Sequence, residues 1–307
     1  MVEYTGNNFA LECDMTSVKE YAYAKVNLYL DVLSKREDGF HDVKTVMHTV
    51  SLADEVTVTV KPSATARVTL CVVGHSKLPT DSRNLAVKAA ELFLASTLIS
   101  AEVNIRLVKN IPVAAGLAGG STDAAAVLRA LNKVFKRPLT EKRLLALAGE
   151  LGSDVPYCLL GGTALCYGRG EIIERLPENL RLNVVVAIAD EYVSTPTAYS
   201  ELDRIYADFK EPRSDDSSLA FDAVIKAVTT GKLTDVKLFN VFENAIFPIC
   251  SKAENIKKKM LELGATHSLM SGSGPSVFGI FPDEASATNA KSCFVNEGFR
   301  AYCALSV

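Results

Sequence analysis

The sequence predicts an α+β protein built from two domains. Its 307 residues exceed the ~150 residues that are typical of one domain. Segments with helical spacing are mixed with alternating, strand-like segments that form local hairpins, and this mixture favours α+β over a strict strand–helix repeat. Hydrophobic residues make up 48% of the chain and charged residues 22%, so it has enough apolar surface for a core.

The candidate domain boundary lies near residue 170. A region rich in glycine, from Gly161 to Gly170, ends there, and an apolar segment at 182–189 follows. The first twenty residues lack an apolar core and begin with acidic side chains, so they read as an extension without a signal or transit peptide. The division is therefore an extension at 1–20, an N-terminal domain at 21–170 and a C-terminal domain at 171–307.

Strands and helices follow one another along the N-terminal half. From Tyr21 to Val32 apolar residues alternate with polar or aromatic ones, which indicates a strand with one core face and one polar-aromatic face. Pro138 and Gly152 punctuate the later helices. The elements expected here are strands at 21–32, 55–60, 67–73 and 101–108, and helices at 84–98, 121–135 and 141–151.

The C-terminal half shows the same mixture. Its longest uncharged stretch, at 263–282, is broken by glycines and two prolines, so it predicts loop and strand rather than a transmembrane helix. The elements expected here are strands at 182–189, 276–281 and 300–305, and helices at 197–209, 218–228 and 253–263.

Composition excludes several classes of function. The net charge of −3 provides no global basic field, so we expect no nucleic acid or membrane partner. Seven cysteines without a C-x-x-C pair indicate reduced thiols in the cytoplasm and no zinc site. The histidines lack metal-ligand spacing, so we expect no protein-ligated metal.

The strongest local signal is the run P-V-A-A-G-L-A-G-G-S-T at residues 112–122, between a strand and a helix. Small residues let a ligand approach the backbone, and the free N–H groups at the helix start attract phosphate. The run is neither a P-loop nor a dinucleotide fingerprint, and no protein-kinase motif is present. A turn that lets a helix pack closely on a sheet is the alternative.

Four other features favour structural roles when each is taken alone. The glycine run at 270–276 reads as a turn, and Lys25 as a lysine that protects a strand edge. Asp154 reads as a helix N-cap and His41 as a solvated turn residue.

Together, these segments resemble the three signature regions of the GHMP kinase superfamily: the strand that carries Lys25, the loop at 112–122 and the glycine run at 270–276. The block K-R-E-D-G-F-H at 35–41 resembles the branch that acts on a cytidine diphosphate-linked methylerythritol. The resemblance implies a ribosomal-protein-S5-like N-terminal domain and a ferredoxin-like C-terminal domain. It also implies an ATP-dependent small-molecule kinase, with Mg²⁺ held mainly through the ATP phosphates, that is a monomer or weak homodimer.

The resemblance also implies site residues. Lys25 and Asp154 would be the catalytic pair. The base of the substrate would be closed by Tyr199, with Tyr192 as the alternative. The full ATP-binding set is Pro112, Val113, Ala114, Ala115, Gly116, Leu117, Ala118, Gly119, Gly120, Ser121, Thr122, Asn84 and Lys109, and the substrate set is Asn27, Phe40, His41 and Tyr199.

The chain departs from the superfamily branch at three places. Phe40 stands where tyrosine is common, and Ala114-Ala115 stand where glycines are common. Asp123, where asparagine is common, adds a negative charge beside the phosphate loop. Two alternatives stay open: another kinase of the superfamily, acting on homoserine, a mevalonate derivative or a sugar, and a catalytically silent nucleotide-binding relative.

Overall fold

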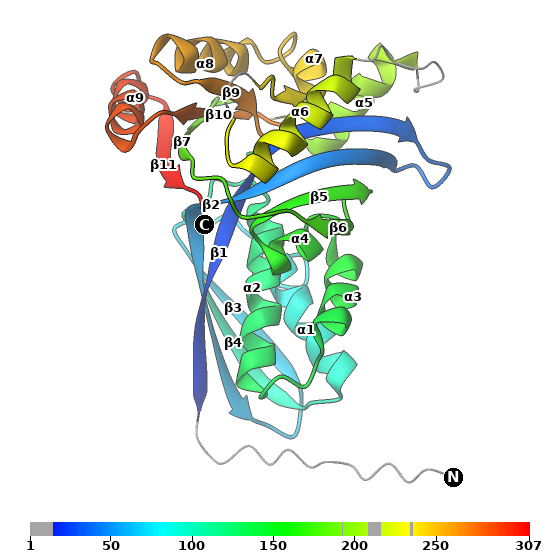
Figure 1. Cartoon of the computed structure of the whole chain (residues 1–307). Helices are drawn as coiled ribbons and strands as arrows, with labels where there is room; N and C mark the ends of the chain where they lie inside the picture. The colour runs from blue at the N-terminus through cyan, green and yellow to red at the C-terminus, as the bar shows by residue number, and fades with distance from the viewer. Residues whose placement is uncertain (1–14, 192, 208–215, 234–235) are drawn as a thin grey trace.

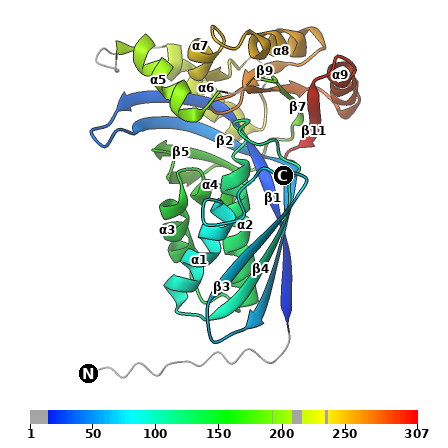
Figure 2. The same cartoon turned by 180° about the vertical axis from the view of Figure 1, so that it is seen from behind.

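The computed structural model describes residues 15–191, 193–207, 216–233 and 236–307. Two β-sheets organise it (Figures 1 and 2). Helices α1 to α4 lie with the larger sheet, α5 and α7 to α9 gather around the smaller one, and α6 lies against β1 and β8 of the larger sheet. Within these described ranges, no helix combines the length and the apolar character needed to cross a bilayer.

A long hairpin forms the backbone of the larger sheet. Strand β1 (Thr16–Lys35) pairs antiparallel with β2 (His41–Pro62), from Thr16 opposite Val60 to Lys35 opposite His41. The turn between them contains Gly39 at φ +82°, a conformation that suits glycine. Strand β1 begins ahead of Tyr21, the predicted start of the N-terminal domain, and so includes the last residues of the predicted extension at 1–20. Residues 1–14 lie outside the described residues.

Both faces of β1 are buried over residues 24–32, whereas the alternation predicted a single core face. Helix α6 (Asp216–Thr230) and strand β8 (Phe239–Asn240) come from the C-terminal half and lie against β1. Phe221 of α6 packs against Tyr29 with ring centroids 5.2 Å apart, and Gly272 lies against Asn27 and Lys25. Lys25, Asn27 and Tyr29 are accordingly each at most 4% exposed.

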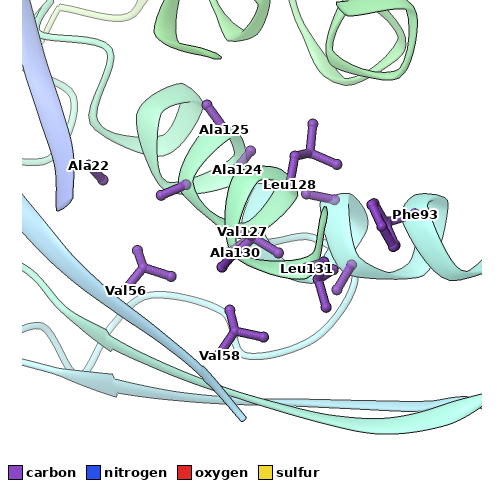
Figure 3. Packing of buried hydrophobic residues seen from close by; sticks show 14 of the residues in the cluster. Ala22, Val56, Val58, Phe93, Ala124, Ala125, Val127, Leu128, Ala130 and Leu131 are labelled. Atoms are coloured by element: carbon purple, nitrogen blue, oxygen red, sulfur yellow. The ribbon is translucent and has the colours of Figure 1, made fainter. Parts of the chain in front are cut away.

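The larger sheet has the order β3-β4-β2-β1-β8, with β5 paired to β2 and β6 paired to β5. Helix α2 packs on it through alanines that are fully buried and let the helix approach closely. Figure 3 shows Val56 and Val58 of β2, Val127 and Leu128 of α2, and Phe93 of α1 in this core. The other elements are β3 (Arg67–Val73), β4 (Ala101–Val108), β5 (Thr163–Gly168), β6 (Ile172–Arg175), α1 (Leu85–Thr97), α2 (Gly119–Val134), α3 (Glu141–Leu151) and α4 (Val155–Leu160).

The smaller sheet is antiparallel, in the order β11-β7-β10-β9. The C-terminus crosses back to the larger sheet, where Ser306 bridges Val50. The elements are β7 (Asn183–Ile188), β9 (His267–Met270), β10 (Ser276–Phe281), β11 (Arg300–Leu305), α5 (Thr195–Ile205), α7 (Phe242–Ile246), α8 (Ser251–Glu262) and α9 (Glu284–Asn296).

The predicted helices and strands are present and the α+β class is confirmed with them. Most ends shift by a few residues, but the strand predicted at 55–60 belongs to β2, which already begins at His41, and the predicted end of the helix at 197–209 lies outside the described residues. The pattern missed β5, β6, β8, β9, α7 and α9, which are mostly too short to show a period. Helix α9 is longer, but its buried side chains are only Ala287, Ala290 and Phe294, so it carries a weak apolar stripe. The boundary near residue 170 stays a prediction, since β8 joins a sheet made otherwise of earlier strands.

Candidate active site

A cavity of about 770 Å³ lies where the two halves meet, and most of the predicted site residues line it. The β1–β2 hairpin, the loop before α2, the start of α4, α5 and the glycine run at 270–276 all contribute to its wall. The predicted residues that line it are Lys25, Asn27, Phe40, His41, Ala114, Ala115, Gly116, Leu117, Ala118, Gly119, Gly120, Ser121, Asp154 and Tyr199.

Lys25 is buried and held in a hydrogen-bonded chain. Its Nζ donates to Asn27 Oδ1 at 2.8 Å, and Asn27 Nδ2 donates to Thr45 Oγ1 at 2.8 Å. The amide of Gly272 donates to the same Asn27 oxygen at 2.9 Å. Lys25 does not protect a free strand edge, because β1 pairs with β2 on one side and, on the other, the Lys25 backbone N–H donates to Leu117 O at 3.3 Å in the loop before α2. Its ammonium group is instead oriented in the cavity wall.

Asp154 occupies the N-cap position of α4 but makes no capping hydrogen bond. Its side chain lines the cavity, so the structure does not use it as the cap that the local pattern favoured. Burial, and after it the charge of Asp154, raises the pKa of Cys158 and of Tyr199. The carboxylate therefore lies within electrostatic reach of both the helix it precedes and the aromatic side of the cavity.

The N-terminus of α2 faces the cavity. Ala118, at φ +58°, precedes the helix and provides no side-chain cap, so the N–H groups of the first turn have no side-chain acceptor. Gly119, Gly120 and Ser121 line the cavity at this point. Uncapped amides and the helix dipole together make a site for phosphate oxygens. Thr122 points elsewhere, since its hydroxyl donates to Tyr23 O at 2.8 Å.

The two glycine runs touch each other. Ser271 Oγ donates to Gly116 O at 3.0 Å, and Ser276 Oγ donates to Ala115 O. A Cβ on Gly116 would lie 2.0 Å from Ser271 O, so only glycine allows this approach. Gly272 and Ser273 line the cavity. The late glycine run is thus part of the site wall and more than a turn.

Lys109 does not line the cavity. Its Nζ forms ion pairs with Asp54 and, at 2.8 Å, with Asp123, and all three side chains are buried. Asp54 Oδ1 also accepts from Ile111 N at 2.8 Å, so this cluster fixes the backbone just before the loop at 112–122. Contact between Lys109 and ATP stays a prediction.

Asn84, Pro112 and Val113 also lie outside the cavity wall. Asn84 is the N-cap of α1: its Oδ1 accepts from Ala86 N at 3.0 Å, and its Nδ2 donates to Pro79 O at 2.9 Å. Its side-chain groups are therefore engaged in local structure.

Asp123 is a buried carboxylate. Burial raises its pKa from the usual 3.8 to about 8, Lys109 opposes the rise and Asp54 adds to it. Its Oδ1 has no hydrogen-bond partner among the described residues. With a pKa of about 8 the Asp123 carboxyl is mostly protonated at neutral pH, and it becomes an additional buried negative charge beside Asp54 only in alkaline solution.

Aromatic side chains line the end of the cavity away from Lys25. Phe40 is 52% exposed, and His41 stacks on Tyr199 with ring centroids 4.7 Å apart. His41 Nε2 and Asp203 Oδ1 lie 2.7 Å apart. These groups offer ring faces and polar atoms to a planar base. Tyr192, the alternative to Tyr199, lies outside the described residues.

Sequence reasoning missed several polar residues that line this cavity, among them Thr45, Arg169 and Asp203. Asp203 follows Tyr199 by four positions, a spacing that places both on one face of a helix, so that signal was available. Thr45 and Arg169 carry no comparable local signal, because their roles depend on β2 and β5 lying side by side.

Comparison with known proteins shows to which family the chain is similar. The protein-family model described as GHMP kinases N terminal domain matches residues 84–162, and the family model described as GHMP kinases C terminal matches residues 221–301. The 4-diphosphocytidyl-2-C-methyl-D-erythritol kinase of Caldicellulosiruptor saccharolyticus is 41% identical over 274 residues, which cover 88% of this chain and 90% of the relative. That of Gloeobacter violaceus is 41% identical over 277 residues, covering 89% and 88%.

Solved structures of kinases are also similar to this chain. A crystal structure of 4-(cytidine 5'-diphospho)-2C-methyl-D-erythritol kinase has a TM-score of 0.76 at 32% identity, covering 94% of this chain and 100% of the other. A homoserine kinase from Cytophaga hutchinsonii has a TM-score of 0.74 at 21% identity, covering 95% and 94%, and shares the fold.

Proposed function

The chain belongs to the GHMP kinase family and, within it, to the 4-diphosphocytidyl-2-C-methyl-D-erythritol kinases, and we propose that it phosphorylates the substrate which that name gives. The reaction transfers the γ-phosphoryl group of ATP to the 2-hydroxyl of 4-diphosphocytidyl-2-C-methyl-D-erythritol. It yields the 2-phosphate and ADP, in non-mevalonate isoprenoid precursor biosynthesis.

One observation carries the assignment of the chemistry. Lys25, Asp154 and the uncapped first turn of α2 line a single cavity. Phosphoryl transfer relies mainly on positioning and on stabilising charge, which an ammonium group, a carboxylate and backbone amides provide. The structure therefore offers an acceptor side and a phosphate side that face the same space.

Asp154 orients the acceptor hydroxyl and accepts its proton. A carboxylate is too weak a base to ionise an alcohol in advance, so the proton moves as the bond to phosphorus forms. Lys25 stabilises the negative charge that develops on the acceptor oxygen. Asn27 holds the Lys25 ammonium in place through its Oδ1.

The first turn of α2 holds the ATP phosphates. Hard oxygen donors suit Mg²⁺, and Asp154 and Ser121 bring such oxygens to the cavity. No group of three or more His, Cys, Asp or Glu side chains gathers as a metal site in the described part of the chain. When bound, Mg²⁺ would be held mainly by the ATP phosphates, with Asp154 and Ser121 as the nearby oxygen donors, and it would offset the phosphate charge during transfer.

The aromatic end of the cavity takes the cytosine base. Phe40 and Tyr199 offer ring faces, and His41, fixed by Asp203, offers a ring nitrogen. Stacking and a polar contact together select a planar heterocycle.

We infer a monomer or weak homodimer in the cytoplasm that acts on small molecules, without nucleic acid or membrane. The mild net charge of −3 supports the expectation of no nucleic acid partner, and the free thiols of the cysteines that the structure describes support the cytoplasm. The monomer or weak homodimer is what the family resemblance implies.

The test is a coupled assay for ADP with ATP, Mg²⁺ and the cytidine diphosphate substrate. We expect turnover with this substrate and none with homoserine or mevalonate. Asp154→Ala should lower kcat by ~10²–10⁴-fold, because it removes the proton acceptor. Asp190→Ala, at an exposed surface ion pair with Arg300, is the matched control and should keep wild-type kcat.

Two results would contradict the proposal. If Asp154→Ala keeps the wild-type turnover and the wild-type circular dichroism spectrum, Asp154 is not the proton acceptor. Nucleotide binding without ADP production by the wild type supports the silent-relative alternative.

A further inference from the structure

We propose that Arg169 binds the diphosphate that links the base to the acceptor moiety, and so selects substrates with that linker. The inference rests on the proposed function. It concerns the turn between β5 and β6, which the sequence did not assign to the site.

The turn places Arg169 on the cavity wall. The Arg169 guanidinium lies 5.0 Å from the centre of the Phe40 ring, in a cation–π arrangement. Its backbone N–H donates to Glu171 Oε2 at 2.7 Å, which fixes the turn. The side chain is thus directed toward the aromatic that we assign to the base.

The next residue lies against the proposed catalytic carboxylate. A Cβ on Gly170 would lie 3.9 Å from Asp154 Oδ1, and φ of +111° is a conformation that favours glycine. One short turn therefore runs from Asp154, where the acceptor hydroxyl is phosphorylated, to Phe40, where the base stacks. The diphosphate joins those two groups in the substrate, so it has to pass along this turn.

The charges of the cavity also point to Arg169. Lys25 is engaged by Asn27, and Lys35 forms an ion pair with Asp203 at 2.8 Å. Arg169 Nε, by contrast, lies 3.8 Å from Glu171 Oε1, which is too long for a hydrogen bond, and the side chain is 34% exposed. The planar guanidinium group of Arg169 therefore remains available for the bidentate hydrogen bonds that phosphate oxygens favour.

A structural role is the competing explanation. Arg169 could serve only to hold Phe40 in place. The two roles separate by ligand: loss of a Phe40 support weakens every cytidine ligand equally, whereas loss of a phosphate contact weakens only ligands that carry the diphosphate.

The experiment measures binding of cytidine and of cytidine 5'-diphosphate by titration calorimetry. In Arg169→Gln we expect cytidine diphosphate to bind ~10–100-fold more weakly, the effect of losing charge-assisted hydrogen bonds, and cytidine to bind within about twofold of wild type. Arg175→Gln is the matched control: it removes an exposed arginine of β6 that pairs with Glu141, and should leave both affinities unchanged.

Kinetics provide a second readout. In Arg169→Gln the KM for the substrate should rise by a similar factor while the KM for ATP stays unchanged, and Arg169→Lys should recover part of the loss by restoring charge without the fork. Equal weakening of both ligands, or no weakening, overturns the inference. If the wild type turns over the substrate and Arg169→Gln has the same KM as the wild type, only the inference about Arg169 is overturned. If the wild type does not turn over the substrate, the proposed function is overturned as well.

Discussion

At the scale of single residues, buried charge is the feature that most needs explanation. Asp54 and Asp123 share Lys109, and all three are nearly inaccessible to water. Taking charges out of water is costly unless each is paired and hydrogen-bonded. Asp54 meets this condition through the Ile111 amide, whereas Asp123 leaves one oxygen without a partner among the described residues. Asp123 is therefore the weak member of the cluster.

Replacing Asp123 with asparagine should stabilise the protein at alkaline pH. The pKa of Asp123 is about 8 in the fold and near 3.8 when unfolded, so the unfolded state binds fewer protons between these values and stability falls as pH rises. Asp123→Asn should remove that slope and be more stable than wild type at pH 8.5 by ~1–2 kcal/mol. Urea unfolding at pH 5, 6.5 and 8.5 measures this. If the pH slope of stability persists in Asp123→Asn, the assignment of that slope to Asp123 is wrong. The control Asp190→Asn, at the surface, should keep the wild-type slope.

At the scale of elements, the site depends on two glycine runs that meet. Asn240, at the end of β8, donates from Nδ2 to Met270 O at 2.7 Å and to Gly272 O at 2.9 Å. Gly272 in turn donates to Asn27, which holds Lys25. The late glycine run therefore positions the proposed catalytic lysine through backbone contacts, which local sequence does not reveal.

Gly272→Ala should impair catalysis more than stability. A Cβ at Gly272 would lie 2.9 Å from Gly116 O and 3.3 Å from Lys25 Nζ, so one of the runs or the lysine has to move. Displacement of a catalytic group by about 1 Å costs roughly 10²-fold, and we expect kcat/KM to fall by ~10–100-fold. Gly264→Ala is the control, since Gly264 also has positive φ but open space around it. If both variants lose activity equally, backbone strain and not the contact is responsible.

At the scale of the whole molecule, one buried histidine joins both halves. His48 Nδ1 lies 2.8 Å from Thr163 Oγ1, and His48 Nε2 lies 2.8 Å from Ser306 Oγ. Burial, and after it the charge of Arg181, lowers the pKa of His48 from 6.5 to about 4. The C-terminus is thus attached to the larger sheet through a histidine that stays neutral.

His48→Gln should flatten the loss of stability in acid. The unfolded histidine takes up a proton below about pH 6.5 and the folded one only near pH 4, so stability is lost as pH falls through this window. Between pH 7 and 4.5 we expect wild type to lose ~2 kcal/mol more than His48→Gln, measured by urea unfolding. His267→Gln should keep the wild-type slope. An equal acid loss in His48→Gln and wild type assigns that loss to other groups.

The sequence by itself determined the α+β class, most of the helices and strands, and the segments that line the cavity. Alternation in β1, small residues before α2 and turn chemistry around Gly39 act over a few positions, so neighbours along the chain are enough to predict them. Motifs also predicted Lys25, Asp154 and the loop at 112–122 as site residues, and the structure brings Lys25, Asp154 and residues 114–121 of that loop to one cavity.

Only the tertiary structure decided which partners those residues meet. Lys25 reads locally as an edge lysine, yet its backbone N–H donates to Leu117 O in the loop before α2 and Asn27 orients its ammonium. The family resemblance implies that Lys109 contacts ATP, and the structure places its ammonium group in a buried ion pair with Asp54, 55 positions away. The contact of Ser271 with Gly116 spans 155 positions. Burial and pairing depend on segments far apart in the chain docking together, so no local pattern carries that information.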